Sequence, residues 1–372
     1  MEPVTQARDG NIVLALNSGS SSLKFGLYDV SGTRAAELFA GSMEATHSQA
    51  QLFDRIEASL AEADMPAPTA IGHRVVHGGP KLRRHSRIDG EVIAQLEDAV
   101  AFAPLHGPAS LALIHLAETH YPMLPQVVCF DTVFHATLPE IAYVLPIPRS
   151  LSCEGVRRYG FHGLSCASIV RQLGSDLPER LIIAHLGNGA SVTAVKAGLS
   201  VETSMGLTPT GGVVMGSRTG DLDPGVLLYL LREKGLDGAA LEALVDQQSG
   251  LLGISGISSD MRALHLAATE NADARLAIDL FCYSVRKQIG AMAAALGGID
   301  MLVFTGGIGE NDEMIRSSIS RDLRWVGAFA IRVIASQEDE QIARESDRVL
   351  ADIGRGKPCA SPAMPLAITR SE

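Results

Sequence analysis

The chain has 372 residues, enough for two domains, and 46% of them are apolar, which provides ample material for a hydrophobic core. Its net charge of −11 argues against non-specific binding to nucleic acid, because that binding needs a basic face. The five cysteines include no C-x-x-C pair and no metal-ligand spacing, which favours a reduced, cytoplasmic setting. We expect no signal peptide, since the N-terminal residues lack an apolar segment.

Short apolar runs alternate with amphipathic segments along the chain, which is typical of an α/β fold. Residues 281–296 are expected to form a helix, because apolar residues recur there every three or four positions and two glycines follow. The expected strands are residues 12–16, 23–28, 70–76, 126–130, 181–185, 192–196 and 301–305.

The first two expected strands are separated by six small polar residues, NSGSSS at positions 17–22, and Lys24 follows at once. One interpretation is a hairpin turn, since Gly, Asn and Ser favour turns. The other is a phosphate-binding loop, in which backbone N–H groups and hydroxyls surround an anion and a lysine adds charge. The segment is not a Walker loop. Lys24 lies two residues past Ser22 on the same strand face, so its charge is expected to reach the loop.

One uncharged run, residues 99–117, is long enough to raise the question of a membrane span. It contains two prolines, a glycine and two histidines, which break a helix or are costly in lipid. We therefore expect this run to form a loop, APLHGP, that leads into a buried helix beginning near Pro108.

A weak internal repeat relates two distant segments. The stretch IVLALNSGSSSLKFGL can be laid over IIAHLGNGASVTAV with Gly19 on Gly189, and apolar runs then match on both sides. Two copies of a strand, a polar glycine turn and a second strand suggest a duplicated domain with a ligand held between the two turns. Coincidence is the alternative, because hairpins that contain glycine are common.

Several glycine-rich loops that carry polar residues directly follow expected strands. They contain Arg74 in HRVVHGG, Asp131 in CFDTVFH, His162 in RRYGFHG, Arg218 in MGSRTGD, and the turn FTGGIGEN. Four of these features have a structural alternative: a surface ion pair for Arg74, a helix N-cap for Asp131, a core histidine for His162, and the plain end of a strand for the last turn. Together they indicate a ligand site, since α/β folds bind ligands at this edge of the sheet.

In seven segments the chain resembles the acetate and propionate kinase family. The segments follow one another in the family order from residue 11 to residue 311: LNSGSSSLK, HRVVHGG, FDTVFH, RRYGFHG, HLGNGAS, TSMGLTPTGGVVMGSRTGDLDPG and GGIGEN. The family belongs to the superfamily of sugar kinases, Hsp70 and actin, whose duplicated, ribonuclease H-like α/β domains close over ATP.

The resemblance implies an organisation and a reaction. The implied domains are residues 1–134 completed by 338–372, and residues 135–337, which bind the nucleotide. The implied reaction is reversible phosphoryl transfer between ATP and acetate, which gives acetyl phosphate and ADP with Mg²⁺, or alternatively Mn²⁺, as cofactor. The resemblance also implies a cytoplasmic homodimer without nucleic-acid or membrane partners.

The family's functional residues map onto positions of this chain. Arg74 and Arg218 match the arginines that hold carboxylate and phosphoryl oxygens, and a guanidinium fork suits both anions. His162 matches the histidine that steadies the transferring group, and Asp131 matches the catalytic aspartate, which orients an arginine or the substrate. The implied acyl pocket consists of Val76, Leu105, Phe161 and Pro209.

The remaining implied residues bind nucleotide and metal. Asn17 and Glu338 match the Mg²⁺ ligands, with Asp339 and Glu340 as neighbouring alternatives to Glu338 in the segment SQEDEQIA. The implied nucleotide-binding residues are Ser20, Ser22, Lys24, His185, Leu186, Gly187, Asn188, Gly189, Asp260, Met261, Arg262, Gly307, Ile308, Gly309, Glu310 and Asn311.

Two positions depart from the family pattern. Cys166 stands where the family usually has histidine, and Gly107 stands where it usually has asparagine. These departures leave two alternatives to an acetate kinase open. One is a kinase for propionate or other short-chain acids, and the other is a nucleotide-binding sensor with weakened catalysis.

Overall fold

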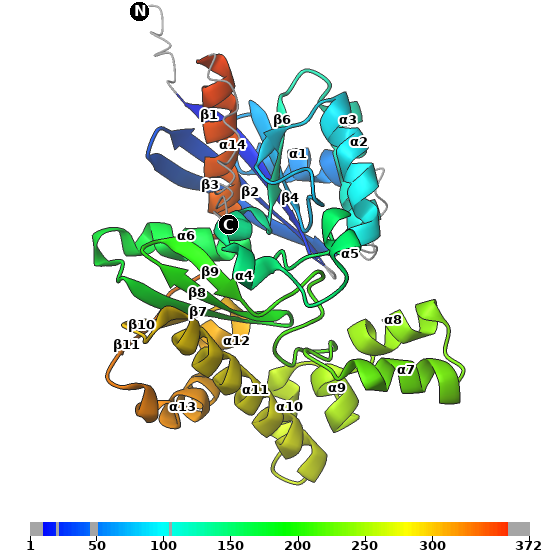
Figure 1. Cartoon of the computed structure of the whole chain (residues 1–372). Coiled ribbons are helices and arrows are strands. Elements are labelled where there is room, and N and C mark those ends of the chain that lie inside the picture. The colour runs from blue at the N-terminus through cyan, green and yellow to red at the C-terminus, as the bar shows by residue number, and fades with distance from the viewer. Residues whose placement is uncertain (1–9, 20–21, 45–50, 104–105, 356–372) are drawn as a thin grey trace, which may run out of the picture.

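The computed structural model describes residues 10–19, 22–44, 51–103 and 106–355. In these ranges the chain forms two mixed sheets, each covered by helices (Figure 1). The first sheet has the strand order β3-β2-β1-β4-β6-β5. Its strands are β1 Asn11–Ser18, β2 Ser22–Ser31, β3 Arg34–Glu44, β4 Ala70–Val75, β5 Ser86–Arg87 and β6 Gln126–Phe130. The second sheet has the order β11-β10-β7-β8-β9. Its strands are β7 Arg180–Leu186, β8 Ala190–Lys196, β9 Leu199–Thr203, β10 Met301–Thr305 and β11 Ala330–Val333.

The two sheets repeat one topology. In the first sheet β1 pairs antiparallel with β2 and parallel with β4, and in the second sheet β7 pairs antiparallel with β8 and parallel with β10. The predicted repeat is therefore confirmed, because its two segments are the corresponding hairpins β1–β2 and β7–β8. The expected fold class of two duplicated α/β domains is confirmed with it.

Fourteen α-helices lie within the described ranges. They are α1 Leu52–Glu62, α2 Gly90–Ala99, α3 Gly107–His120, α4 Glu140–Tyr143, α5 Arg149–Cys153, α6 Gly163–Leu173, α7 Pro224–Glu233, α8 Gly238–Gln247, α9 Gly250–Ser255, α10 Met261–Ala267, α11 Ala272–Leu296, α12 Gly306–Asn311, α13 Glu313–Arg321 and α14 Glu338–Gly354. Helix α3 begins where the sequence predicted, with Pro108 in its first turn. No helix in the described part of the chain is long and apolar enough to span a membrane.

The last helix, α14, packs on the first sheet. Ile342 and Ala343 are fully buried in a cluster with Val13 and Ala15 of β1. The helix approaches β4 so closely that a Cβ at Gly72 would lie 2.7 Å from the side chain of Ile342, so only glycine fits there. These contacts support the prediction that a C-terminal segment completes the first domain. The residue numbers of the domain boundaries stay a prediction.

The core of the second domain centres on α11. Phe281, Val285 and Ile289 are buried against its sheet, as the periodicity predicted. The helix begins nine residues earlier than the prediction, at Ala272, because Asn271 caps it and accepts a hydrogen bond from Ala274 N. Apolar periodicity did not indicate these first turns, since the residues buried there are small alanines. Gly297 ends the helix in the left-handed conformation, at a φ of 69°.

The strands that sequence reasoning missed lie at or near sheet edges. β11 is exposed along its whole length, and most residues of β3 are exposed or only partly buried. Edge strands need less apolar surface than central ones, so their sequences lack the apolar runs by which the other strands were recognised.

Both domains contain histidines that are buried in the folded protein. His73, His77, His85 and His135 are each less than 9% exposed, and burial lowers the pKa of each to about 4. Each has at least one hydrogen-bonded ring nitrogen; His135, for example, contacts Ser200 Oγ and the Phe161 carbonyl, both at 2.9 Å. The fold therefore holds these imidazoles in their neutral form.

We expect this burial to make the protein sensitive to acid. The unfolded chain takes up protons on these histidines below pH 6.5, whereas the folded chain does not until about pH 4. The free energy of unfolding should therefore fall as pH drops through this window, by about 1.4 kcal/mol per histidine and pH unit. Burial raises the pKa of Asp131 and Asp339, which acts in the opposite direction and reduces the slope. Urea unfolding at pH 7, 6 and 5 measures the effect.

Two variants test whether buried histidines cause this pH dependence of the unfolding free energy. His73→Gln removes one buried titrating group, so its unfolding free energy should depend less steeply on pH than that of the unchanged chain. His115→Gln, at a position where half of the side chain is exposed, should leave the slope unchanged. Equal slopes for all three proteins would contradict the assignment to buried histidines.

Candidate active site

A cavity of about 610 Å³ opens between the two domains. It lies where the central strands of both sheets end, at Ser18 of β1, Val75 of β4, Leu186 of β7 and Thr305 of β10. From the first domain, from α14 and from the two residues that precede α14 it is lined by Asn17, Ser18, Gly19, Lys24, Tyr28, Glu37, Arg74, Val76, His106, Asp131, Ser336, Gln337, Glu338, Asp339 and Glu340. From the second it is lined by Phe161, His162, His185, Gly187, Asn188, Gly189, Pro209, Arg218, Gly306, Gly307 and Glu310.

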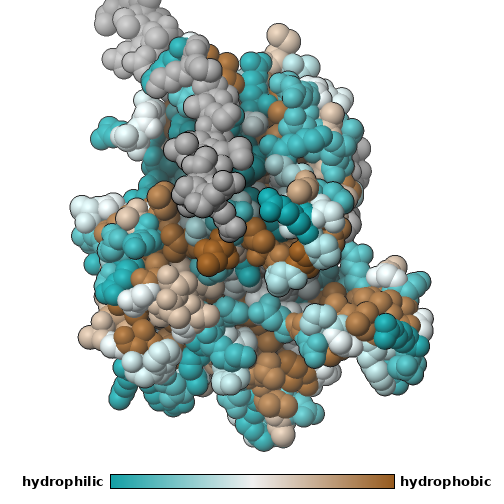
Figure 2. Space-filling view, viewed as in Figure 1, coloured by the Kyte–Doolittle hydropathy of each residue, from teal (hydrophilic) through white to brown (hydrophobic). Residues whose placement is uncertain are grey.

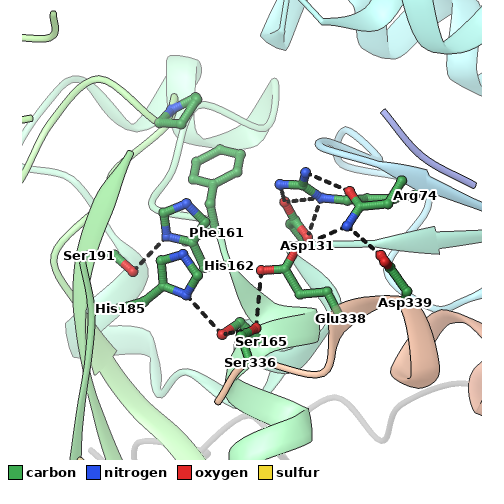
Figure 3. A network of polar contacts seen from close by, with 12 residues as sticks. Arg74, Asp131, Phe161, His162, Ser165, His185, Ser191, Ser336, Glu338 and Asp339 are labelled. Carbon is green, nitrogen blue, oxygen red and sulfur yellow. Dashed lines mark hydrogen bonds and ion pairs between the residues drawn. The ribbon is translucent and has the colours of Figure 1, made fainter. Parts of the chain in front are cut away.

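A buried ion pair forms one wall of the cavity (Figure 3). Arg74 lies on β4 and Asp131 directly follows β6, and these parallel neighbours bring the two side chains together. Arg74 donates to Asp131 from Nη2 at 2.7 Å and from Nε at 3.1 Å, and its Nη1 donates to Asn17 Oδ1 at 3.0 Å. The side chains are only 15% and 2% exposed, so the surface ion pair considered for Arg74 is excluded. The N-cap considered for Asp131 is also excluded, because its carboxylate contacts Arg74 and caps no helix.

Electrostatics keep Arg74 charged. Burial lowers the pKa of its guanidinium, but the carboxylates of Asp131, Glu338 and Asp339 raise it above its usual value. Burial raises the pKa of the Asp131 carboxyl, and the nearby guanidinium opposes that shift. The result is an immobilised cation whose planar fork is suited to an anion in the cavity.

His162 faces Arg74 from the second domain. It is a non-glycine residue in the left-handed conformation, at a φ of 57°, immediately before α6. Such backbone strain, of the order of 1–3 kcal/mol, is common at functional sites. Its Nδ1 contacts Ser191 Oγ at 2.9 Å, and its ring stacks on that of His185 at 4.1 Å. Burial, His185 and the two arginines Arg74 and Arg218 lower its pKa well below 6.5, so His162 is neutral.

Arg218 completes a cationic surface. It lies in the loop before α7, its Nη1 donates to the Pro209 carbonyl at 3.2 Å, and burial lowers its pKa. Gly189 lies between the two second-domain groups: a Cβ there would be 3.4 Å from His162 Nε2 and 3.5 Å from Arg218 Nη1. A glycine at this position leaves room for a ligand that contacts both groups.

An apolar corner adjoins these charges. Val76, Phe161 and Pro209, three of the four predicted acyl-pocket residues, line the same cavity, and the fourth, Leu105, lies outside the described residues. His106 also lines it, and burial together with the two arginines lowers the pKa of His106 to about 4. Sequence analysis missed His106 because its segment was interpreted only as a loop before a helix.

Three glycine-containing turns surround the rest of the cavity. β1 and β2 pair as an antiparallel hairpin, which confirms the hairpin interpretation of this segment. Asn17, Ser18 and Gly19 line the cavity, and phosphate binding by this segment stays a prediction. Lys24, opposite Asn17 in the hairpin, lines the cavity as expected. The other two turns contribute residues 187–189 and the first two residues of α12.

Several predicted nucleotide-binding residues do not line the cavity. Ser20 lies outside the described residues, and Met261 is buried in the core of the second domain. Asp260 caps α10 and pairs with Arg262 at 2.9 Å. Their roles stay predictions. The other predicted residues that the cavity does not include are Ser22, Leu186, Ile308, Gly309 and Asn311.

The predicted metal ligands, two carboxylates and an amide, lie together at the start of α14. Asn17 Nδ2 donates to Asp339 Oδ1 at 2.7 Å and to Glu338 Oε2 at 3.3 Å. Burial raises the pKa of Glu338, but Arg74, His185 and Asn17 outweigh it, so the net shift is downward and the carboxylate is ionised. No group of three or more His, Cys, Asp or Glu side chains with metal-binding geometry occurs among the described residues. Two carboxylates and an amide fit Mg²⁺, which is commonly held by one or two carboxylates together with substrate phosphates.

Comparisons with known proteins agree with this geometry. A model of the acetokinase family matches residues 43–348. The acetate kinase of Deinococcus radiodurans is 44% identical over 345 residues, covering 84% of this chain and 86% of the relative. That of Nitrobacter hamburgensis is 42% identical over 346 residues, covering 85% of each chain.

Solved structures match over almost the whole chain. A propionate kinase from Francisella tularensis aligns with a TM-score of 0.82 at 34% identity, covering 91% of this chain and 100% of the other. The acetate kinase of Porphyromonas gingivalis aligns with a TM-score of 0.79, at the same identity and coverage. A family match over most of the chain, relatives above 40% identity and the shared architecture lead to one conclusion: this chain belongs to the acetokinase family.

Proposed function

We propose that the protein is an acetate kinase, which transfers the terminal phosphoryl group of ATP reversibly to acetate and so forms acetyl phosphate and ADP. The observation that carries this proposal is the convergence of Arg74, Arg218 and neutral His162 on one cavity that also has an apolar corner. Two fixed cations and a neutral imidazole suit a carboxylate that meets a phosphoryl group, while the apolar corner suits a methyl group.

In this proposal the protein works mainly by positioning and charge. Arg74 and Arg218 hold the carboxylate and the phosphoryl oxygens and stabilise the charge that spreads over them during transfer. His162 donates a hydrogen bond to the same group without adding a third positive charge. Asp131 acts through Arg74: its two hydrogen-bonded oxygens keep the guanidinium plane turned toward the cavity.

The choice between acetate and a longer acid rests on Val76, Phe161 and Pro209. An apolar pocket discriminates one methylene by only about 1–3 kcal/mol, so propionate is expected as a slower substrate. The matched structures include both an acetate kinase and a propionate kinase, and the predominance of acetate kinases among the relatives favours acetate.

The activity is tested with purified protein, ATP, Mg²⁺ and acetate, with hydroxylamine to trap the acyl phosphate. We expect product with acetate and less with propionate and butyrate. Arg74→Ala should reduce kcat by about 10²–10³-fold, as the loss of a transition-state donor does. Arg332→Ala, which removes an exposed arginine paired with Asp176, should leave the rate unchanged.

The alternative of a catalytically weakened sensor makes the opposite prediction. No acyl phosphate from any of the three acids, together with measurable ATP binding, would replace the kinase proposal with the sensor. Cys166 would then be the first residue to replace by histidine. Its buried thiol, with a pKa raised to about 12 by burial, donates a hydrogen bond to Thr193 Oγ1 at 3.8 Å and supplies no charge to the site.

Mg²⁺ is the cofactor that we propose, held by Glu338 and Asn17 with Asp339 beside them. When bound, the ion neutralises the charge of the nucleotide phosphates. We expect Glu338→Gln to raise the Mg²⁺ concentration for half-maximal activity by at least tenfold, the scale on which lost partners of metal sites act. Asp339→Asn should raise it less, because burial raises the pKa of Asp339 and weakens it as a ligand. A larger effect at Asp339 would assign the main ligand to that residue.

We also propose a cytoplasmic homodimer, as the family resemblance implies. The four cysteines among the described residues are free thiols, which supports a reduced location. The hairpin of α7 and α8 supports self-association, because neither helix has a buried residue and Leu228, Tyr229 and Leu231 are 40–51% exposed. Apolar side chains gather on this hairpin in Figure 2.

Sedimentation velocity tests the dimer and its surface. The unchanged chain should sediment as a dimer, and the double variant Leu228→Glu with Tyr229→Glu should sediment as a monomer. Leu266→Glu, at an apolar position of α10 that is 81% exposed, is the matched control and should stay dimeric. A monomeric unchanged chain would refute the homodimer, and a dimeric double variant would place the interface elsewhere.

A further inference from the structure

A chain of two hydroxyl groups connects His185 to the segment that leads into α14 (Figure 3). His185 Nδ1 contacts Ser165 Oγ at 2.8 Å, and the Ser336 hydroxyl donates to Ser165 Oγ at 3.0 Å. Ser165, on α6, is completely buried, and Ser336 lies two residues before Glu338. The mechanism described above uses neither serine.

Counting protons along this chain determines the state of His185. Each hydroxyl has one proton, and the hydrogen-bond partners of Ser165 Oγ among the described residues are His185 Nδ1 and Ser336 Oγ. When Ser165 accepts from Ser336, its own buried proton therefore has His185 Nδ1 as its acceptor, and leaving that proton unpaired would be costly. Burial lowers the pKa of His185, so its ring is neutral and carries one N–H. Because Nδ1 accepts, that N–H must be at Nε2.

The second ring nitrogen is the one available to a ligand. His185 lines the cavity, and its Nε2 has no hydrogen-bond partner among the described residues. Its ring stacks on that of His162, whose Nδ1 is likewise engaged by a serine, Ser191. Two neutral imidazoles therefore lie side by side, each with Nδ1 engaged by a hydroxyl.

We propose that Ser165 and Ser336 are positioning residues that hold His185 in the Nε2–H form, so that it donates a hydrogen bond to a phosphoryl oxygen in the cavity. This inference rests on the proposed kinase function. A neutral donor fits this place, because a protonated His185 would add a third positive charge beside Arg74 and Arg218 and compete with them for the same anion.

The chain also links His185 to two other parts of the site. Ser336 N donates to Glu310 Oε1 at 2.9 Å, and the same oxygen accepts from Gly306 N at 3.0 Å. The hydroxyl of Ser336 lies 3.4 Å from Glu338 Oε1, a longer contact than the one to Ser165. Ser336 therefore connects three parts of the site: His185 through Ser165, the start of α12 through Glu310, and the segment that carries the candidate metal ligand. Glu310, predicted to bind nucleotide, has this linking role in the structure.

The 3.4 Å contact defines the competing arrangement. If Ser336 donated to Glu338 instead, Ser165 would donate to Ser336 and accept from the histidine, which would place the proton of His185 on Nδ1. The two arrangements predict opposite tautomers and can therefore be distinguished without measuring activity.

Long-range ¹H–¹⁵N NMR spectra of the ¹⁵N-histidine-labelled chain give this readout, with His185→Gln to assign the signal. We expect the Nε2–H pattern at neutral pH in the unchanged chain and its loss or exchange broadening in Ser165→Ala. Ser168→Ala is the matched control, because this serine is equally buried on the same helix and contacts no histidine. We expect Ser168→Ala to give the same Nε2–H pattern as the unchanged chain.

Kinetics complete the test. Ser165→Ala and Ser336→Ala should lower kcat by about tenfold, the lower end of the effect of a lost orienting partner, with little change in the KM for acetate. Ser336→Thr keeps the hydroxyl and should restore the rate. An Nδ1–H pattern in the unchanged chain, or an unchanged pattern in Ser165→Ala, would overturn the inference. Equal losses of the Nε2–H pattern or of kcat in Ser165→Ala and Ser168→Ala would also overturn the inference. Failure of the kinase function itself would appear separately, as an unchanged chain without activity.

Discussion

The site depends on the buried ion pair between Arg74 and Asp131. Three strands and the last helix meet at this guanidinium, because Asn17 of β1 accepts from it and in turn donates to the carboxylates at the start of α14. Breaking a buried pair by removing one partner typically costs about 3–5 kcal/mol, since the other charge stays in a poorly solvated place. The ends of the strands are therefore held in one arrangement by the same charges that line the cavity.

The opposite wall obeys a different constraint. The second domain contributes neutral imidazoles, glycines and one arginine to this wall, rather than a second buried ion pair. Burial and the nearby arginines keep His162 unprotonated, and Gly189 leaves space between it and Arg218. A cavity with fixed cations and neutral donors stabilises an anionic group without excess positive charge that would hold the product too tightly. The turns of the corresponding hairpins β1–β2 and β7–β8 both line this cavity.

Sequence reasoning succeeded where a pattern is local. Central strands such as β6 and β10 were predicted because they are buried on both faces and consist of continuous apolar runs. Edge strands such as β11 lack such a run and were missed. Of the candidate site, Arg74, Asp131, His162 and Arg218 were identified from glycine-rich loops and family motifs. His106 and Ser336 were missed, because a lone histidine or serine in a loop carries no signal until the fold places it.

By itself, the sequence determined the α/β class, the repeat, the family and the residue types at the cavity, because apolar periodicity and short motifs are properties of neighbouring positions. Only the tertiary structure decided which of these groups are charged, paired or neutral. Asp131 is an ion-pair partner and not a helix cap, and His162 is a cavity residue and not a core residue, because strands distant in sequence end side by side. Protonation and hydrogen-bond direction depend on burial and on neighbours from other segments, and a linear pattern contains neither.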